Sequence, residues 1–322
     1  MTTITPAETP TALATDSFHL CCWSCGDVLN PRVSGSHPCV RCGAVTLQED
    51  GIWRSLPPGR AESFDRFIAE YEFIREAEAR GSNDPAYYLA LPYDDITGKL
   101  AAQWKIRAAT YRHLERKILS RLQKRPLRIL DLGAGNGWLS YRLSLLGHRP
   151  VAVDILTNNR DGLGAAAHYA AHLPSMFPRV QASVDRLPFP RAAFDLAIFN
   201  ASFHYSKDYT RTLAEALRCT CPGGKIVIAD SPWYRHESSG TAMVEEKHAH
   251  FRSVYGFASN SLASQEFLTP QRLDALATAL GIRWQILKPF YGVHWALRPL
   301  RAKLKGRRTP SEFRIFMAEV PA

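Results

Sequence analysis

The stretch from Leu127 to Gly137, which reads LRILDLGAGNG, constrains the fold of this chain more than any other segment. Its apolar first half predicts a buried strand, and its glycines predict a tight turn into a helix. Gly133, Gly135 and Gly137 let the backbone turn sharply and approach a ligand without an intervening Cβ. A second apolar strand ends at Asp154, 17 residues after Gly137. A carboxylate at that distance suits the two hydroxyls of a ribose, so the pattern predicts a site for a nucleoside-bearing ligand.

The spacing of the glycines narrows the choice of that ligand. Dinucleotide sites use G-x-G-x-x-G, so that a helix N-terminus receives the pyrophosphate. This chain has G-x-G-x-G instead, with the acid Asp131 two residues before the first glycine. A carboxylate there repels a pyrophosphate and favours a cationic amino group. The motif DLGAGNG therefore resembles the first motif of the class I S-adenosylmethionine-dependent methyltransferases.

Later segments follow the same family in order. Residues 183–189 resemble its acidic loop after the third strand, 194–200 its fourth strand, and 222–229 the turn and fifth strand, with a helical pattern over 210–218 between them. The resemblance is specific over about residues 125–230. It implies an α/β, Rossmann-like fold with a seven-strand, mostly parallel sheet. Two further strands, over 283–290 and 313–320, resemble the antiparallel pair that closes this fold.

The same resemblance implies a set of residues that bind S-adenosylmethionine. Asp131 and the glycine turn would hold the methionine moiety, and Asp154 the ribose. Asp185 would bind the adenine amino group, with Arg186 and Leu187 beside the ring. The complete expected cofactor set comprises Asp131, Gly133, Ala134, Gly135, Asn136, Gly137, Asp154, Ile155, Asp185, Arg186, Leu187, Asn200 and Ala201.

A second site is predicted by the cysteines near the N-terminus. Cys22 and Cys25 form one C-x-x-C pair, Cys39 and Cys42 form another, and 13 residues separate the pairs. This spacing is typical of a four-thiolate zinc site, which is structural because no coordination position stays open. Cys21 is the alternative to Cys22 as a ligand, and two disulfides are the competing interpretation. Zinc is preferred because nothing in the sequence indicates secretion.

The segment between the cysteines and the glycine turn has helical patterns over 63–80 and 99–123. Many small-molecule members of the family use such an extension as a lid, which excludes water from the reaction. Four residues of this segment are our candidates for lining the cofactor or acceptor site: Tyr87, Tyr88, Trp104 and Arg107.

The catalytic candidates follow the fourth strand, where the family places the transferred methyl group. His204 could act as a general base near neutral pH, and Tyr205 is its neighbour. Residues 200–205 lack the Asn/Asp-Pro-Pro-aromatic tetrad of enzymes that methylate amino groups of nucleic-acid bases. Direct displacement at the sulfonium methyl, driven by proximity and orientation, is the expected reaction.

Residues 293–310 carry six Lys and Arg and no acid, with leucines between them. This pattern predicts a basic amphipathic helix that could meet a phosphate, an RNA backbone or an anionic membrane surface, and a solvated basic insertion is the alternative. No run of eighteen apolar residues predicts a membrane span, and the N-terminus lacks the pattern of a secretory signal, so we expect a cytoplasmic protein.

Three functions are compatible with these patterns. A small-molecule acceptor, such as a natural product, a quinone-like compound or a lipid-linked compound, is favoured by the aromatic lid. A ribosomal or transfer RNA base is the alternative, supported by the zinc ribbon and the net charge of +10, and a scaffold without turnover is the third. We expect a disordered leader over residues 1–20, a zinc ribbon over 21–57, a helical linker or lid over 58–124 and the methyltransferase domain over 125–322. The sequence does not specify the oligomeric state.

Overall fold

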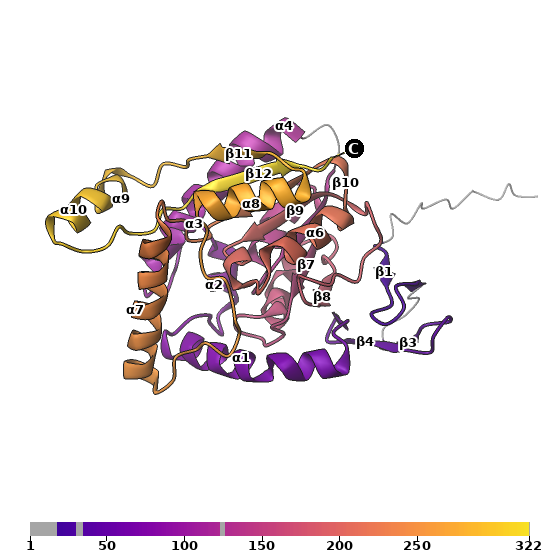
Figure 1. The fold of residues 1–322 in the computed structure, drawn as a ribbon. Coiled ribbons are helices and arrows are strands. Elements are labelled where there is room, and N and C mark those ends of the chain that lie inside the picture. The colour runs from indigo at the N-terminus through magenta and orange to yellow at the C-terminus, as the bar shows by residue number, and fades with distance from the viewer. Residues whose placement is uncertain (1–17, 30–34, 123–125, 322) are drawn as a thin grey trace, which may run out of the picture.

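A computed structural model describes residues 18–29, 35–122 and 126–321 of the 322-residue chain. Most of its strands belong to one ten-stranded sheet, and the remaining two form a separate antiparallel hairpin. Across the sheet the strands are ordered β11-β12-β10-β9-β6-β7-β8-β5-β4-β3 (Figure 1). Their bounds are β1 Leu20–Cys21, β2 Val28–Leu29, β3 Gly35–Pro38, β4 Val45–Glu49, β5 Ile52–Arg54, β6 Arg128–Leu132, β7 Arg149–Asp154, β8 Arg179–Gln181, β9 Phe194–Asn200, β10 Thr220–Ala229, β11 Trp284–Leu287 and β12 Ile315–Glu319.

Seven of the strands, from β8 to β11 in the sheet order, form the fold expected from the sequence. β8, β7, β6, β9 and β10 are parallel, and β12 and β11 close the sheet in antiparallel pairing. The expected seven-strand, mostly parallel sheet is therefore confirmed. The cysteine-bearing segment adds β5, β4 and β3 to the edge of this sheet, with β5 pairing in parallel to β8.

Helices cover both faces of the sheet because alternate residues of each central strand point to opposite sides. Leu130 of β6 packs toward α6 and α8, whereas Ile129 packs toward α3 and α5. The helices are α1 Pro58–Ala77, α2 Pro85–Ala90, α3 Ala101–Leu114, α4 Ser120–Leu122, α5 Trp138–Leu145, α6 Tyr209–Cys219, α7 Glu237–Tyr255, α8 Pro270–Leu280, α9 Val293–Ala296 and α10 Arg298–Leu304. A π-helical turn, η1 Glu115–Leu119, links α3 to α4, and η2 Leu163–His172 and η3 Phe203–Tyr205 are 3-10 helices.

The helical patterns of the sequence correspond to real helices whose ends differ. The helix expected over 63–80 is α1, which begins earlier because Pro58 and its fixed φ suit the first helical turn. The pattern over 99–123 is divided among α3, η1 and α4. Leu20, expected in the leader, is fully buried in β1 and pairs with Leu29. Residues 1–17 of that leader lie outside the described part of the chain.

The path of the chain brings α1 over the edge of the sheet where the parallel strands end. β5 leaves the sheet at Arg54, and only three residues separate it from Pro58 at the start of α1. In Figure 1, α1 runs along the lower side of the molecule, beneath the strands. The cysteine-bearing segment thus fixes one end of this helix. Within the described residues, no helix is both long and apolar enough to span a membrane.

Candidate active site

A cavity lies between the carboxyl ends of the central strands and α1. Its floor, as we call it, is contributed by the turns that follow β6, β7 and β9. Floor residues are Asp131, Gly133, Ala134, Gly135, Asn136, Asp154, Ile155, Leu156, Asn200, Ala201 and Ser202. The carboxyl edge of a parallel sheet is where ligands bind in open α/β folds.

The glycine turn shapes this floor through close packing. Gly133 has φ +74°, and a Cβ built there would lie 2.2 Å from Cβ of Ser202. The N–H groups of Gly133 and Ala134 both donate to the carbonyl of Val153, over 2.8 and 3.0 Å. The turn is therefore bonded to the end of β7 on one side and packed against the loop after β9 on the other.

Asp131 is a buried acid in the cavity wall. Its side chain accepts a hydrogen bond from Oγ of Ser140 over 2.8 Å, and the residue is 1% exposed. Burial raises the pKa of this carboxyl to about 7. No cation of the described chain pairs with it, so a cationic ligand group would stabilise its ionised form.

Asp154 presents its carboxylate between the two turns. One oxygen accepts from the N–H of Gly135 over 2.7 Å, and the other from the N–H of Leu156 over 2.9 Å. Burial raises the pKa of Asp154 despite these bonds. A carboxylate oxygen can accept about two hydrogen bonds, so each oxygen of Asp154 has capacity left for a hydroxyl donor in the cavity.

The roof of the cavity is one face of α1. Its lining residues recur at intervals of four, three, four and four, the spacing of one helical face. They are Arg60, Phe64, Phe67, Tyr71 and Arg75. Tyr71 and Phe67 also pack against Tyr205 from the floor side, with ring centroids 5.8 and 6.2 Å apart. The cavity is thus polar below and mainly aromatic above.

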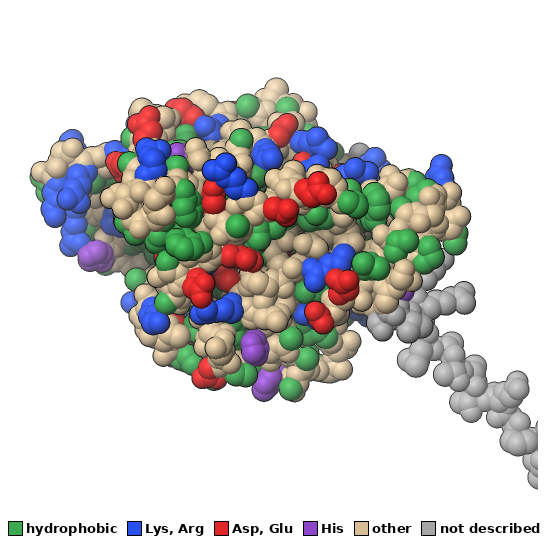
Figure 2. Space-filling model, turned by 90° about the horizontal axis from the view of Figure 1, so that it is seen from below, with side chains coloured by type: hydrophobic (Ala, Val, Ile, Leu, Met, Phe, Trp, Pro, Cys, Tyr) green, Lys and Arg blue, Asp and Glu red, His purple; other side chains and the backbone are tan. Residues whose placement is uncertain are grey.

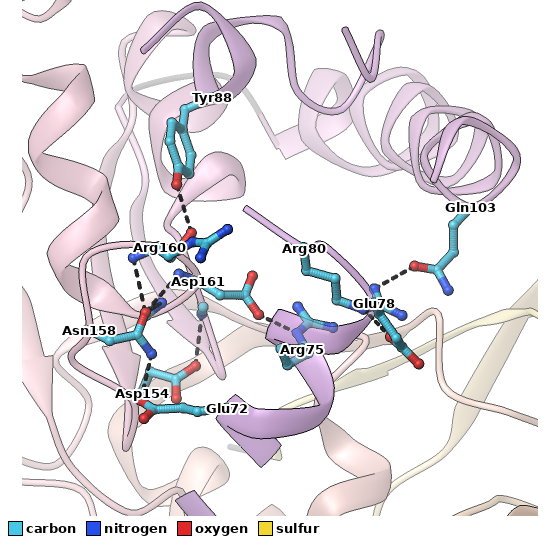
Figure 3. A network of polar contacts seen from close by, with 12 residues as sticks. Glu72, Arg75, Glu78, Arg80, Tyr88, Gln103, Asp154, Asn158, Arg160 and Asp161 are labelled. Atoms are coloured by element: carbon cyan, nitrogen blue, oxygen red, sulfur yellow. Dashed lines mark hydrogen bonds and ion pairs between the residues drawn. The ribbon is translucent and has the colours of Figure 1, made fainter. Parts of the chain in front are cut away.

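Charged side chains hold this roof in place at both ends. Arg60 forms an ion pair with Asp185, and Arg75 forms one with Asp161. A hydrogen bond from Ser183 and the positive charges of Arg60 and Arg211 lower the pKa of Asp185. Figure 3 shows the second end, where Asp161 points toward Arg75 across the gap between the loop and α1.

Further polar contacts reinforce that second end. Nδ2 of Asn158 donates to Glu72 over 2.7 Å, and its Oδ1 accepts the N–H groups of Arg160 and Asp161 (Figure 3). The side-chain amide of Asn158 thereby connects the backbone of the loop after β7 to α1.

Three of the four lid candidates line the cavity, namely Tyr87, Trp104 and Arg107. The guanidinium of Arg107 lies 5.0 Å from the ring centre of Trp104. Unlike Arg75, it makes no ion pair within the described part of the chain, and burial lowers its pKa. Arg107 is therefore available to an anionic ligand group. Tyr88 instead lies behind the wall, where its hydroxyl donates to the carbonyls of Ser82 and Arg160.

The two catalytic candidates are placed differently. Tyr205 lines the cavity, and burial raises the pKa of its hydroxyl well above the usual value. His204 does not line it, since its Nδ1 faces Oγ of Ser231 at 3.4 Å. Burial lowers the pKa of His204 to about 4, so the ring is neutral at physiological pH. Neither group is arranged to take a proton from a ligand.

Three expected cofactor residues lie outside the cavity lining. Gly137 would, with a Cβ, come 3.1 Å from Cβ of Ala166, so it serves the packing behind the turn. Arg186 donates to the carbonyl of Trp23 over 2.8 Å, and Leu187 is buried in the core. The side chain of Arg186 thus contacts the cysteine-bearing segment, whereas Asp185 of the same loop lines the cavity.

Several lining residues were not singled out from the sequence. Arg60, Arg75, Asp161 and Leu262 were missed because their role depends on the docking of distant segments. The spacing along α1 was visible, but it indicates a buried face without saying what that face covers.

The four predicted cysteines meet in a separate cluster. The sulfur atoms of Cys22, Cys25, Cys39 and Cys42 all lie within 4.8 Å of one another. The Cys25–Cys39 and Cys22–Cys42 sulfur pairs are 3.5 and 3.7 Å apart, close to the roughly 3.8 Å edge of a tetrahedron with Zn–S bonds of about 2.3 Å. All seven cysteines are free, and Cys21 is not in the cluster.

Comparison with known proteins gives the decisive observation. A family model described as a methyltransferase domain matches residues 130–228, which include the glycine turn, Asp154 and the loop after β8. Residues 130–228 therefore form a methyltransferase domain, of the class I S-adenosylmethionine-dependent type. The matched segment contains every residue of the cavity floor.

Curated relatives are similar over part of the chain. A demethylmenaquinone methyltransferase of Thermus thermophilus is 28% identical over 52% of this chain and 80% of its own length. A malonyl-[acyl-carrier protein] O-methyltransferase of Halorhodospira halophila is 29% identical over 58% of this chain and 55% of its own length. Among solved structures, a putative sarcosine dimethylglycine methyltransferase from Galdieria sulphuraria has 16% identity and a TM-score of 0.49, covering 67% of this chain and 86% of its own.

Proposed function

We propose that this methyltransferase transfers a methyl group from S-adenosylmethionine to a small-molecule acceptor inside the roofed cavity. The observation that carries the proposal is the contrast between its walls, with acids on the floor and aromatic rings on the roof. The floor fits a charged nucleoside cofactor, and the rings fit an apolar or aromatic acceptor body.

The cofactor site is assigned from the groups that the floor leaves available. Asp131 faces the cationic amino group, because the carboxyl is buried without a cationic partner. Asp154 accepts the ribose hydroxyls through its free lone pairs. Ile155 and Asp185 bound the adenine side. Arg107, which has no ion pair within the described residues, suits the methionine carboxylate or an acidic group of the acceptor.

The sulfonium cofactor supplies an electrophilic methyl group, so the protein has mainly to orient the acceptor and exclude water. Phe67, Tyr71 and Tyr205 form an aromatic wall that does both. The raised pKa of Tyr205 and the position of His204 exclude these two residues as the base. We therefore propose an acceptor whose nucleophile ionises readily by itself, such as a quinol-like hydroxyl, an acidic carbon or a carboxylate.

The relatives favour two such acceptors. The names of two relatives identify demethylmenaquinone and malonyl-acyl-carrier protein as their acceptors. A quinone-like ring matches the aromatic roof more closely than a flexible acyl chain does. The alternative of an RNA base requires a flipped base to enter beneath α1, whose two ends are held by ion pairs.

We also propose that the four-cysteine cluster binds one structural zinc ion. The sulfur spacings support it, and the knuckle turns place Gly26 and Gly43 at φ +78° and +74°, where a Cβ is disfavoured. Since the ribbon continues through β5 into α1, zinc would stabilise the roof as well as the ribbon. Zinc quantification should give one ion per chain, and Cys39→Ser should lose it; full zinc content in that variant would contradict the assignment.

The test of the cofactor site is calorimetric titration of S-adenosylmethionine into the full chain, with NAD as the control ligand. Asp154→Ala should weaken binding by about 100-fold or more, because two hydrogen bonds to a charged group are lost. The matched control Asp65→Ala removes an exposed acid of α1 and should bind normally. Unchanged affinity of Asp154→Ala, or binding of NAD alone, would contradict the proposal.

The acceptor is tested by turnover. Purified enzyme is supplied with a short-chain demethylmenaquinol, with malonyl-acyl-carrier protein and with total RNA, each with labelled cofactor. Methylation of the quinol alone supports the proposal. If label enters only the carrier protein or only RNA, the proposed quinone-like acceptor is wrong. The assignment of the cofactor site would not be affected.

A further inference from the structure

The segment from Phe290 to Arg308, here called the arm, extends beyond the body of the protein and contains α9 and α10 (Figure 1). The two helices are joined by helical hydrogen bonds. The N–H of Leu297 donates to the carbonyl of Val293 over 3.0 Å, and the N–H of Arg301 donates to that of Leu297 over 3.1 Å. The arm is therefore nearly one helix from Val293 to Leu304.

One stripe of this helix is apolar and faces solvent. Val293, Leu297, Leu300 and Leu304 are spaced by four, three and four residues, which places them on one face. Their exposed fractions are 67%, 40%, 54% and 79%, and Phe290 beside them is 73% exposed. A stripe with this spacing ordinarily packs on a core. Here nothing in the described chain covers it, and exposed apolar surface of this kind marks an interaction site.

The other side of the arm explains why the stripe points outward. Trp295 stacks on Phe313 with ring centroids 5.5 Å apart, and Tyr291 packs against both rings. The guanidinium of Arg298 lies 3.7 Å from the ring centre of Trp295. These aromatic contacts attach the arm to the strand region before β12 and fix its orientation.

Cations surround the apolar stripe. Arg301, Lys303, Lys305 and Arg307 are exposed and form no ion pair within the described residues, whereas Arg308 pairs with Glu246. No acid occurs between residues 290 and 308. Figure 2 shows Lys and Arg side chains gathered at the end of the molecule where Figure 1 places α10.

We propose that the arm binds an anionic membrane surface, with its leucines in the headgroup boundary and its lysines and arginines on the lipid phosphates. Both features are needed for such binding, and both occur on this one short helix. An RNA partner would leave the leucine stripe unused. A second copy packed stripe to stripe would bring the four free cations of each copy together. The proposal is independent of the acceptor, although a membrane-bound arm suits a lipid-like acceptor.

The test is flotation of the purified 322-residue protein with two kinds of vesicle. One contains phosphatidylcholine alone, and the other an equal mixture of phosphatidylcholine and phosphatidylglycerol. We expect binding to the mixed vesicles and little to the neutral ones. Leu300→Ser/Leu304→Ser should lower the partition coefficient about ten-fold or more. Arg301→Gln/Lys303→Gln/Lys305→Gln should lower it about a hundred-fold, since each cation near an anionic surface contributes about 1 kcal/mol.

Matched controls remove equivalent surface groups elsewhere. Leu145→Ser/Val254→Ser changes apolar side chains that are 50% and 55% exposed, and Lys99→Gln/Lys105→Gln/Lys117→Gln removes the same charge. Both should float like the wild type. Wild-type protein that ignores anionic vesicles would overturn the proposal, and so would equal losses in the arm and control variants. If the protein does not float and the leucine variant loses dimerisation, the partner of the arm is a second copy of the chain. If it does not float and the charge variant loses RNA binding, the partner is RNA. None of these outcomes depends on turnover.

Discussion

The floor and the roof of the cavity are held by different forces, although both line the same cavity. The floor consists of turns bonded directly to the ends of parallel strands, and Gly133 leaves no room for another atom beside Ser202. The roof is a single helix attached by side-chain ion pairs at its two ends. Backbone hydrogen bonds within a buried sheet resist local opening more than a few side-chain ion pairs do. We therefore predict that the roof opens more readily than the floor.

The largest effect should come from adding one methyl group to the floor. Gly133→Ala forces a Cβ against Ser202 at positive φ, so we expect the free energy of unfolding to fall by about 3 kcal/mol or more. The control Gly223→Ala has the same φ of +74° but nothing within 4 Å of its Cβ. It should lose only about 1–2 kcal/mol. Denaturant unfolding of both variants measures the free energy of unfolding. An equal decrease in the two variants would contradict a tightly packed floor.

Breaking the ion pairs that hold the roof should have a smaller effect than the change in the floor. Arg75→Gln and Asp161→Asn each break an ion pair whose side chains are 20% and 12% exposed, and cofactor affinity should fall about ten-fold in each. The double variant should be no worse than either single one, because the pair acts as a unit. Arg66→Gln breaks an ion pair whose arginine is 79% exposed, and it should change affinity by less than two-fold, roughly. Fully additive losses at Arg75 and Asp161 would show that the two groups act separately.

The buried acid of the floor should make cofactor binding depend on pH. In the free protein the pKa of Asp131 is raised to about 7, and a cationic amino group lowers it on binding. Affinity should therefore rise with pH through 7 and be about ten-fold weaker at pH 6 than at pH 8. Asp131→Asn should bind weakly with a flatter profile. If the wild-type affinity stays constant across this range, Asp131 does not bind the cationic group of the cofactor.

The same acid has an opposite effect on the stability of the free protein. Its folded-state pKa lies above the unfolded value near 3.9, so the protonated form is favoured by folding and stability decreases as pH rises toward 7. Asp131→Asn should accordingly raise the unfolding free energy above pH 7, by about 2–4 kcal/mol. Thermal unfolding of the wild type and of Asp131→Asn at pH 5 and pH 8 measures this difference in stability.

The smallest effect is expected at the aromatic wall. Tyr205→Phe should change kcat by less than about three-fold, because burial keeps the phenol neutral and unable to serve as a base. The pH profile of kcat should keep its shape. A loss of about a hundred-fold together with a changed profile would restore Tyr205 as a catalytic residue.

How much the sequence could predict differs between these regions. The order of strands, the glycine turn and Asp154 were predictable because a turn motif and its strand lie within one short segment. The four thiols were predictable for the same reason, since two C-x-x-C pairs already specify a tetrahedral cluster. Arg186 was expected beside the cofactor and instead contacts the ribbon, because the sequence does not show which side of its loop is covered.

The sequence by itself therefore determined the fold of the sheet, the family and the chemistry of the floor, all of which depend on residues close together in the chain. Only the tertiary structure decided what covers that floor. The pairing of β5 with β8 joins the cysteine-bearing segment to the sheet, and α1 follows it across the cavity. Arg60 meets Asp185 across 125 residues of chain, and Arg75 meets Asp161 across 86. Such contacts depend on how whole elements pack, which no local pattern specifies.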